Sequence, residues 1–231
     1  MLWLDDSDHF PSPLTMNPNR PVAVGLGLSP SKILKAYKMG IFPWMSEDNF
    51  ISWWSPDPRM VLAVRDFKCS RSLKKTLRQN RFIVRHNTAF DQVMTSCAQI
   101  KRKGQSGETW ISQTFIEAYS ELHRMGYAHS METFDAHNDL VGGLYGLLIG
   151  RFFFGESMFA RKTDASKVAL AHLVFWLSSL GVDHIDCQQQ TAHLASLGAK
   201  PVPRADFLKW VEIAVRQKVT PSPHQFSVNK F

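Results

Sequence analysis

The feature that most constrains the fold is the uneven distribution of proline. Eight of the 12 prolines lie in the first 62 residues of this 231-residue chain. Proline lacks an amide hydrogen and has a fixed φ angle, so it limits regular structure to short pieces. One helix is still expected there, because Ser29 can cap it, Pro30 suits its first position and Gly40 follows its last turn. The change in pattern predicts a small N-terminal domain over residues 1–62 and a larger domain over residues 63–231.

Beyond residue 62, apolar residues recur at helical and strand spacings over longer segments. Glycines and polar turns separate these segments. The order of elements predicts a mixed α/β (α+β) fold with a mostly antiparallel sheet. The expected elements are a helix ending at Gly126, strands over 128–134, 140–149 and 151–159, a buried helix over about 165–180 that Thr163 or Asp164 could cap, a strand over 182–187 and a helix over 204–215.

The charge balance favours an anionic partner. The chain has 27 Lys and Arg residues against 20 Asp and Glu residues, and its isoelectric point is near 9.4. Nucleic acid and acidic membrane surfaces both suit such a balance. The three cysteines form no C-x-x-C pair, the acidic start lacks signal-peptide features, and no apolar run reaches the ~20 residues of a membrane span. We therefore expect a cytoplasmic protein that has no disulfide, metal site or membrane partner.

Basic residues dominate the segment from residue 65 to residue 103, where only Asp66 and Asp91 oppose them. An ordinary solvated helix face mixes both signs of charge, so contact with nucleic-acid phosphates explains the bias best. The predicted phosphate-binding residues are Arg71, Lys74, Lys75, Arg78, Lys101 and Arg102.

Asp186 and Gln188 stand two residues apart at the end of a predicted strand, which places both side chains on one face. A carboxylate can orient or deprotonate an amine, and an amide can donate a hydrogen bond to an oxyanion. Such a pair taken alone is more often a polar strand end held by local hydrogen bonds.

Glu156 interrupts an aromatic strand, between Phe152–Phe154 and Phe159. A buried carboxylate requires a partner. A substrate ammonium and an internal ion pair with Arg161 or Lys167 are equally good candidates for that partner.

Tryptophans cluster in the first part of the chain, at Trp44, Trp53 and Trp54, and Trp110 follows later. Flat rings near a basic surface suit base stacking. They also suit the interface between two domains, and we favour that role for Trp53 and Trp54.

Seven sequence blocks together resemble the leucyl/phenylalanyl-tRNA protein transferase family. They follow one another in family order through nearly the whole chain, which makes the resemblance more specific than any single motif. One departure is Gly25-Leu26-Gly27, where the family often has a Gly-Gly pair. The resemblance therefore does not determine the conformation of the turn in that loop. The blocks are GIFPW at 40–44, WWSPDPR at 53–59, TWI at 109–111, LVGGLYG at 140–146, FGESMF at 154–159, DCQ at 186–188 and HLASLGA at 193–199.

The resemblance implies a small N-terminal domain and an acetyltransferase-like (GNAT-like) C-terminal domain. It implies transfer of Leu, Phe or Met from aminoacyl-tRNA to proteins that begin with Arg or Lys, which marks those proteins for degradation. No cofactor is expected, and a monomer is the default. By the same resemblance Asp186 and Gln188 act at the reacting centre, Glu156 helps to position a substrate, Trp44 and Trp110 hold the 3′ adenosine, and Leu144, Phe153, Met158 and Ile185 form the side-chain pocket.

Two questions remain open at this level. Asp186 is a weak base at its usual pKa of about 3.9, so either it has a raised pKa or it mainly orients the acceptor amine, and a tRNA ribose hydroxyl could take the proton instead. An acetyl-CoA-dependent N-acetyltransferase would need a Gly-rich pyrophosphate loop, which residues 159–164 do not provide. A non-catalytic RNA-binding module would leave Asp186, Gln188 and Glu156 without a purpose.

Overall fold

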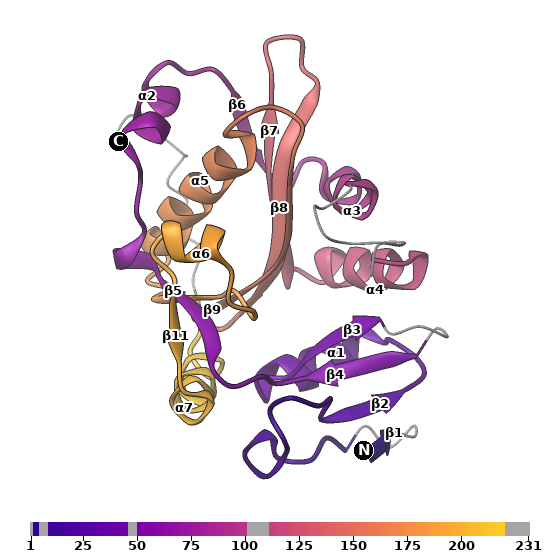
Figure 1. Cartoon of the computed structure of the whole chain (residues 1–231). Coiled ribbons are helices and arrows are strands. Elements are labelled where there is room, and N and C mark those ends of the chain that lie inside the picture. The colour runs from indigo at the N-terminus through magenta and orange to yellow at the C-terminus, as the bar shows by residue number, and fades with distance from the viewer. Residues whose placement is uncertain (1, 5–8, 46–49, 101–110, 220–231) are drawn as a thin grey trace.

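The computed structural model describes residues 2–4, 9–45, 50–100 and 111–219. The N-terminal part forms a four-stranded sheet in the order β1-β2-β4-β3, with helix α1 packed beside it (Figure 1). Its short elements agree with the expectation from the prolines, and Ser29 caps α1 by accepting a hydrogen bond from the Lys32 amide at 3.2 Å. The elements are β1 (Leu2–Leu4), η1 (Pro13–Thr15), β2 (Ala23–Gly25), α1 (Pro30–Lys38), β3 (Phe42–Met45) and β4 (Ile51–Trp54).

The rest of the described chain builds a seven-stranded sheet in the order β11-β5-β10-β9-β8-β7-β6. Every neighbouring pair is antiparallel except β9 and β10, which run parallel. The predicted mixed α/β class and mostly antiparallel sheet are therefore confirmed. The predicted boundary after Leu62 falls inside β5. The strands are β5 (Arg59–Ala63), β6 (Ile83–His86), β7 (Ala128–Phe134), β8 (Leu140–Ile149), β9 (Phe152–Ala160), β10 (His184–Asp186) and β11 (Lys200–Val202).

Helices cover both faces of this sheet (Figure 1). Helix α5 packs on one face, with α2 on its outer side, while α3 and α4 pack on the other face. Asp164 occupies the N-cap position of α5, but its side chain binds Lys167 and Thr76 instead of capping the helix. No helix in the described ranges is long and apolar enough to cross a membrane. The helical elements are η3 (Val64–Asp66), α2 (Arg71–Arg78), α3 (Phe90–Gln99), α4 (Gln113–Arg124), α5 (Ala165–Ser179), α6 (Ala192–Ser196) and α7 (Arg204–Ala214).

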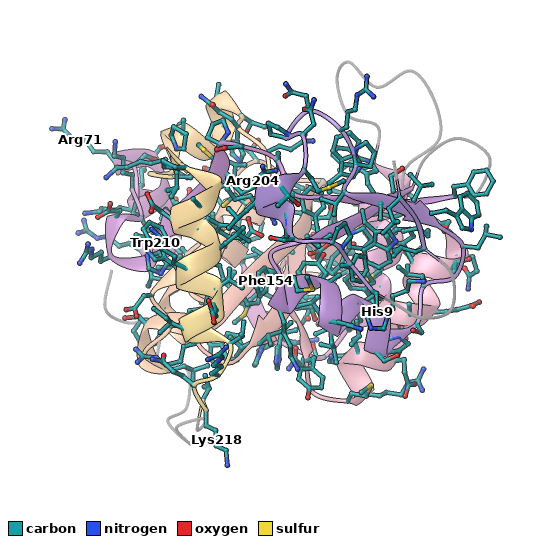
Figure 2. The ribbon with its side chains drawn as sticks, turned by 90° about the horizontal axis from the view of Figure 1, so that it is seen from below. His9, Arg71, Phe154, Arg204, Trp210 and Lys218 are labelled. Atoms are coloured by element: carbon teal, nitrogen blue, oxygen red, sulfur yellow. The ribbon has the colours of Figure 1, made fainter. Side chains whose placement is uncertain are left out.

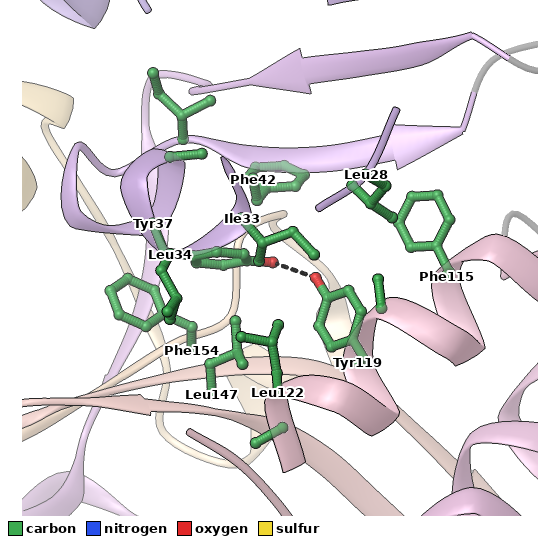
Figure 3. Packing of buried hydrophobic residues seen from close by; sticks show 14 of the residues in the cluster. Leu28, Ile33, Leu34, Tyr37, Phe42, Phe115, Tyr119, Leu122, Leu147 and Phe154 are labelled. Atoms are coloured by element: carbon green, nitrogen blue, oxygen red, sulfur yellow. Dashed lines mark hydrogen bonds between the residues drawn. The ribbon is translucent and has the colours of Figure 1, made fainter. Parts of the chain in front are cut away.

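The largest apolar core joins the N-terminal sheet and α1 to the α3/α4 face of the large sheet. Figure 3 shows Tyr37 of α1 and Tyr119 of α4 meeting in this core beside Phe154. Trp53 is fully buried in the same core, as expected for a packing residue. A second core lies under α5 and contains Phe153. Alternate residues of β9 therefore enter different cores, and the strand connects the two sides of the molecule.

Candidate active site

A pocket of about 380 Å³ opens on the α5 side of the large sheet, where β10 ends beside β9. Its walls are mainly apolar. All four residues predicted to form a side-chain pocket line it, and so do Glu156, Asp186 and Gln188. The structure thus brings residues from four separate strands and loops to one place. The predicted wall residues are Leu144, Phe153, Met158 and Ile185.

A β-bulge in β9 sets the direction of Glu156. Tyr145 of β8 pairs with Ser157, and Gly146 pairs with Gly155, so Glu156 has no partner across the ladder. The extra residue interrupts the regular alternation of side chains along β9. Bulges often re-aim a side chain at functional sites, and here the bulge places the only carboxylate of the strand.

The bulge also explains a glycine in the LVGGLYG block. A Cβ atom at Gly146 would overlap the main-chain oxygen of Phe154 and come within 2.6 Å of the Phe153 ring. Because of the inserted residue, Phe153 and Met158 both lie on the pocket side, although an unbroken strand would place them on opposite faces. The pocket therefore depends on Gly146 and on the bulge opposite it.

Two tyrosine hydroxyls hold the Glu156 carboxylate. Tyr37 donates to Oε1 at 2.5 Å and Tyr119 donates to Oε2 at 3.2 Å, and the two hydroxyls lie 3.0 Å apart (Figure 3). The Gln188 amide Nε2 lies 3.5 Å from Oε1. These contacts link α1 of the N-terminal part, α4 and β9 at one carboxylate.

The ion pair considered for Glu156 is not formed. Arg161 instead donates to the Leu140 carbonyl and Ser96, and Lys167 pairs with Asp164. That alternative interpretation is wrong because both cations point to other acceptors. Within the described part of the chain, Glu156 has hydroxyl and amide donors and no cationic hydrogen-bond partner.

This environment shifts the pKa of Glu156. Burial raises its pKa to about 7, and the nearby Asp186 charge acts in the same direction, while hydrogen bonds from Tyr37 and Tyr119 and the charge of Arg59 oppose the rise. Burial also raises the pKa of both tyrosines well above the ordinary value, so they stay protonated donors. Near neutral pH Glu156 therefore exists in both protonation states, as a proton acceptor or donor requires.

Asp186 has a different environment. It is fully buried and forms a two-point ion pair with Arg59, in which Nε donates to Oδ1 at 2.8 Å and Nη2 donates to Oδ2 at 2.6 Å. Oδ1 also accepts the main-chain amide of Gln188 at 2.9 Å. Gln188 follows β10 with a left-handed φ of 53°. Asp186 and Gln188 thus meet through the Gln188 main chain.

Cys187 also lines the pocket, but burial raises the pKa of its thiol to about 12, so it remains a protonated, unreactive thiol. Within the described ranges, no group of three or more His, Cys, Asp or Glu side chains could hold a metal ion. The pocket can accept an apolar side chain, move a proton at Glu156 and donate a hydrogen bond from Gln188.

The described residues among those predicted to bind nucleic acid are not in the lining of this pocket. All four predicted basic residues of α2 are exposed, and Figure 2 shows Arg71 pointing outward at one end of the molecule. Trp44 lies half-buried on β3 beside Phe42 and is not among the described residues that line the pocket. Trp110, Lys101 and Arg102 lie outside the described residues. The α2 residues are Arg71, Lys74, Lys75 and Arg78.

Sequence comparison assigns the family. The model of the family described as leucyl/phenylalanyl-tRNA protein transferase matches residues 61–212, and the model of its N-terminal domain matches residues 27–57. The chain belongs to the leucyl/phenylalanyl-tRNA protein transferase family. Relatives of that name include proteins from Aromatoleum aromaticum, 53% identical over 89% of this chain and 86% of the relative, and from Bordetella avium, 51% identical over 95% and 91%.

Solved structures are more distant from this member of the transferase family. A probable N-acyltransferase from Enterococcus faecalis matches 78% of this chain and 43% of its own, with 9% identity and a TM-score of 0.42. L-PGS from Bacillus licheniformis matches 74% of this chain and 54% of its own, with 9% identity and a TM-score of 0.36. The family assignment therefore depends on the sequence relatives.

Three site residues of this transferase were not predicted from the sequence: Tyr37, Tyr119 and Arg59. The two tyrosines stand at apolar positions of their helices, where a hydroxyl requires a partner, and that requirement was the available signal. Arg59 begins an otherwise apolar strand within the WWSPDPR block. A charge in that position indicates a buried counter-charge.

Proposed function

We propose that this protein is an aminoacyltransferase that moves an aminoacyl group from a charged tRNA to the N-terminal amine of an acceptor protein. The observation that carries the proposal is one apolar pocket with Glu156 and Gln188 at its edge. The pocket suits the side chain of the aminoacyl group, and the two polar residues suit an amine attacking its ester. The names of the relatives, leucyl/phenylalanyl-tRNA protein transferase, describe the same reaction class.

The pocket favours Leu, Phe and Met as donors. Its walls are flexible or aromatic side chains, including Phe153, Met158 and Leu170. Such a pocket accepts aromatic side chains and aliphatic side chains that are not branched at Cβ, and each methylene contributes about 1–3 kcal/mol of discrimination.

The acceptor begins with Arg or Lys in this proposal. Among the residues that the structure describes, Glu156 is the pocket carboxylate that has no cationic hydrogen-bond partner, since Arg59 binds Asp186. A cationic acceptor suits the negative form of Glu156. On the tRNA side, Trp44 and Trp110 hold the 3′ adenosine, and the exposed basic residues of α2, with Lys101 and Arg102, contact the phosphates.

The reaction requires two proton transfers, one from the acceptor amine to Glu156 and one from Glu156 to the leaving ribose oxygen. The neutral α-amino group attacks the ester carbonyl carbon, a C–N bond forms, and Glu156 accepts the proton that the nitrogen loses. The side-chain amide of Gln188 donates a hydrogen bond to the developing oxyanion. The C–O bond to the tRNA ribose then breaks, and the leaving ribose oxygen takes the proton back from Glu156. A peptide bond and an uncharged tRNA are the products.

The proposal also covers the oligomeric state of the protein, its location and the fate of the acceptor. The protein acts as a monomer in the cytoplasm, and the added residue marks the acceptor for degradation. Sedimentation of the purified protein tests the first point, and the lifetime of an Arg-starting reporter in cells with and without this protein tests the last.

Transfer of radiolabelled leucine from Leu-tRNA tests the central proposal. A model acceptor that begins with Arg is expected to be labelled, and the same acceptor beginning with Gly is not. Acetylation from acetyl-CoA without transfer from tRNA would show a different acyltransferase. Binding of tRNA with no transfer to any acceptor would show a binding module.

A further inference from the structure

Arg59 occupies a fully buried position where three parts of the molecule meet. Its guanidinium lies between the Phe42 ring of β3 and the Phe207 ring of α7, at 4.7 Å and 4.5 Å from the ring centroids. Rings on both sides fix the plane of the guanidinium and stabilise its charge. The side chain is therefore held in one orientation before any substrate binds.

The fixed guanidinium orients Asp186. Two parallel hydrogen bonds, from Nε to Oδ1 and from Nη2 to Oδ2, define both the position and the plane of the carboxylate. Lysine has a single ammonium and could not reproduce this two-point geometry. Asp186 thus has one orientation, which Arg59 sets.

Asp186 in turn holds the main chain of Gln188. Asp186 Oδ1 accepts a hydrogen bond from the main-chain amide of Gln188 at 2.9 Å. The main-chain carbonyl of Gln188 accepts one from the main-chain amide of Met60, the residue after Arg59, at 3.2 Å. A left-handed φ of 53° is uncommon for a residue other than glycine and requires support from its surroundings. With that backbone in place, the Gln188 side chain reaches Glu156.

We infer that Arg59 is a positioning residue of the transfer reaction. It acts through Asp186 to hold the main chain of Gln188 in its left-handed conformation, which keeps the side-chain amide of Gln188 at the edge of the pocket. This inference rests on the proposed aminoacyl transfer. Arg59 is not among the described residues that line the pocket, so its effect on the reaction passes through Asp186 and Gln188. Its loss is expected to lower kcat and to leave the Kd for aminoacyl-tRNA unchanged.

A double-mutant cycle with Gln188→Ala separates this role from a merely structural one. Arg59→Lys is expected to lower kcat about tenfold or more in the wild-type background, because a small misplacement of a reacting group is costly. In the Gln188→Ala background it should lower kcat by less than about twofold. Equal losses in both backgrounds, or no loss in the wild type, would overturn the inference.

Arg204→Lys is the matched control. Arg204, labelled in Figure 2, is also buried and joins distant segments, donating to the carbonyls of Ser55 and Met16. None of its hydrogen bonds in the described ranges is to Asp186. This variant should keep the wild-type kcat within about twofold. If Arg59→Lys does not fold, the paired change Arg59→Met with Asp186→Leu removes both charges together and replaces it in the cycle.

Hydrogen exchange of the Gln188 main-chain amide in the full-length protein gives a readout that needs no activity. The amide should be protected in the wild type and in Arg204→Lys, and should exchange at least about tenfold faster in Arg59→Lys or in the paired variant. Unchanged protection would overturn the inference even if transfer were reduced. Failure of the wild-type protein to transfer leucine from Leu-tRNA would instead contradict the proposed function, so the two failures are distinguishable.

Discussion

The bulge of β9 and the end of β10 each hold a carboxylate beside the same pocket, but the two carboxylates have different partners. Asp186 is bound at two points by Arg59, whereas Glu156 is bound by the hydroxyls of Tyr37 and Tyr119. Burial raises the pKa of Glu156, whose partners are hydroxyls, whereas the partner of Asp186 is a guanidinium. In the proposed mechanism, these surroundings suit Asp186 to a positioning role and Glu156 to proton transfer.

The largest expected effect comes from Glu156→Gln. The variant keeps the size of the side chain and an oxygen for a tyrosine hydrogen bond, but it cannot accept a proton. We expect kcat for leucine transfer to fall by about 10²–10⁴-fold, with tRNA binding unchanged. Single-turnover transfer from Leu-tRNA measures this.

Glu132→Gln is the control for that experiment. Glu132 is fully buried and accepts hydrogen bonds from Ser130 and Thr88, and, as for Glu156, burial raises its pKa. It is not a residue of the pocket lining. Its replacement should leave transfer within about twofold. A wild-type kcat for leucine transfer in Glu156→Gln would show that Glu156 does not transfer the proton, and it would contradict the different roles proposed for Glu156 and Asp186.

Arg59→Met should cause the second largest effect, on stability. It leaves the Asp186 charge buried without a partner, and such a change costs about 3–5 kcal/mol of unfolding free energy. Urea unfolding measures the loss. The paired variant Arg59→Met with Asp186→Leu should recover most of it, and a paired variant as unstable as the single one would show that the ion pair is not the cause.

The stability of the protein is expected to depend on pH through Glu156. The folded-state pKa of Glu156 is about 7, above its ordinary value of about 4.5, so the folded state binds the extra proton between these pH values. The stability that this proton contributes is complete below about pH 4.5 and is lost as the pH rises through 7. The wild type should therefore lose about 3 kcal/mol relative to Glu156→Gln between pH 4 and pH 8. Parallel stability curves, measured by urea unfolding at each pH, would contradict the raised pKa.

Tyr37→Phe and Tyr119→Phe should have the smallest effects. Each hydroxyl stabilises the Glu156 carboxylate, so its removal raises the pKa of Glu156 further, at a cost of about 1 kcal/mol. The acid limb of the transfer rate should move to higher pH by up to about one unit. Tyr127→Phe, outside the hydroxyl cluster, serves as the control, and a shift toward lower pH in either test variant would contradict the assignment.

Local patterns were sufficient to predict much of the fold. The strands β7 and β8 begin and end where the alternation of residues placed them, and α1 begins at its predicted cap. The short strands of the N-terminal sheet were not predicted individually, because three- and four-residue strands between prolines carry little periodicity. β10 begins two residues later than expected, at His184, and ends one residue earlier, at Asp186, shortly before the chain turns left-handed at Gln188.

The site was only partly predictable. Its apolar walls, Glu156 and the Asp186-Gln188 pair follow from the family resemblance and the strand pattern. Its partners do not, because Tyr37 and Tyr119 are 82 residues apart and Arg59 is 127 residues from Asp186. Contacts of this range depend on the tertiary fold. The bulge at Glu156 is likewise a property of the pairing between β8 and β9.

The pH dependence of single-turnover leucine transfer tests the central claim most directly. In the wild type, the acceptor amine and Glu156 must both be deprotonated, so the logarithm of the rate should fall with a slope of about two below pH 7. In Glu156→Gln the slope should be about one, from the acceptor amine alone. An unchanged slope of two in Glu156→Gln would contradict the account and would place the proton on another group, such as a ribose hydroxyl of the tRNA.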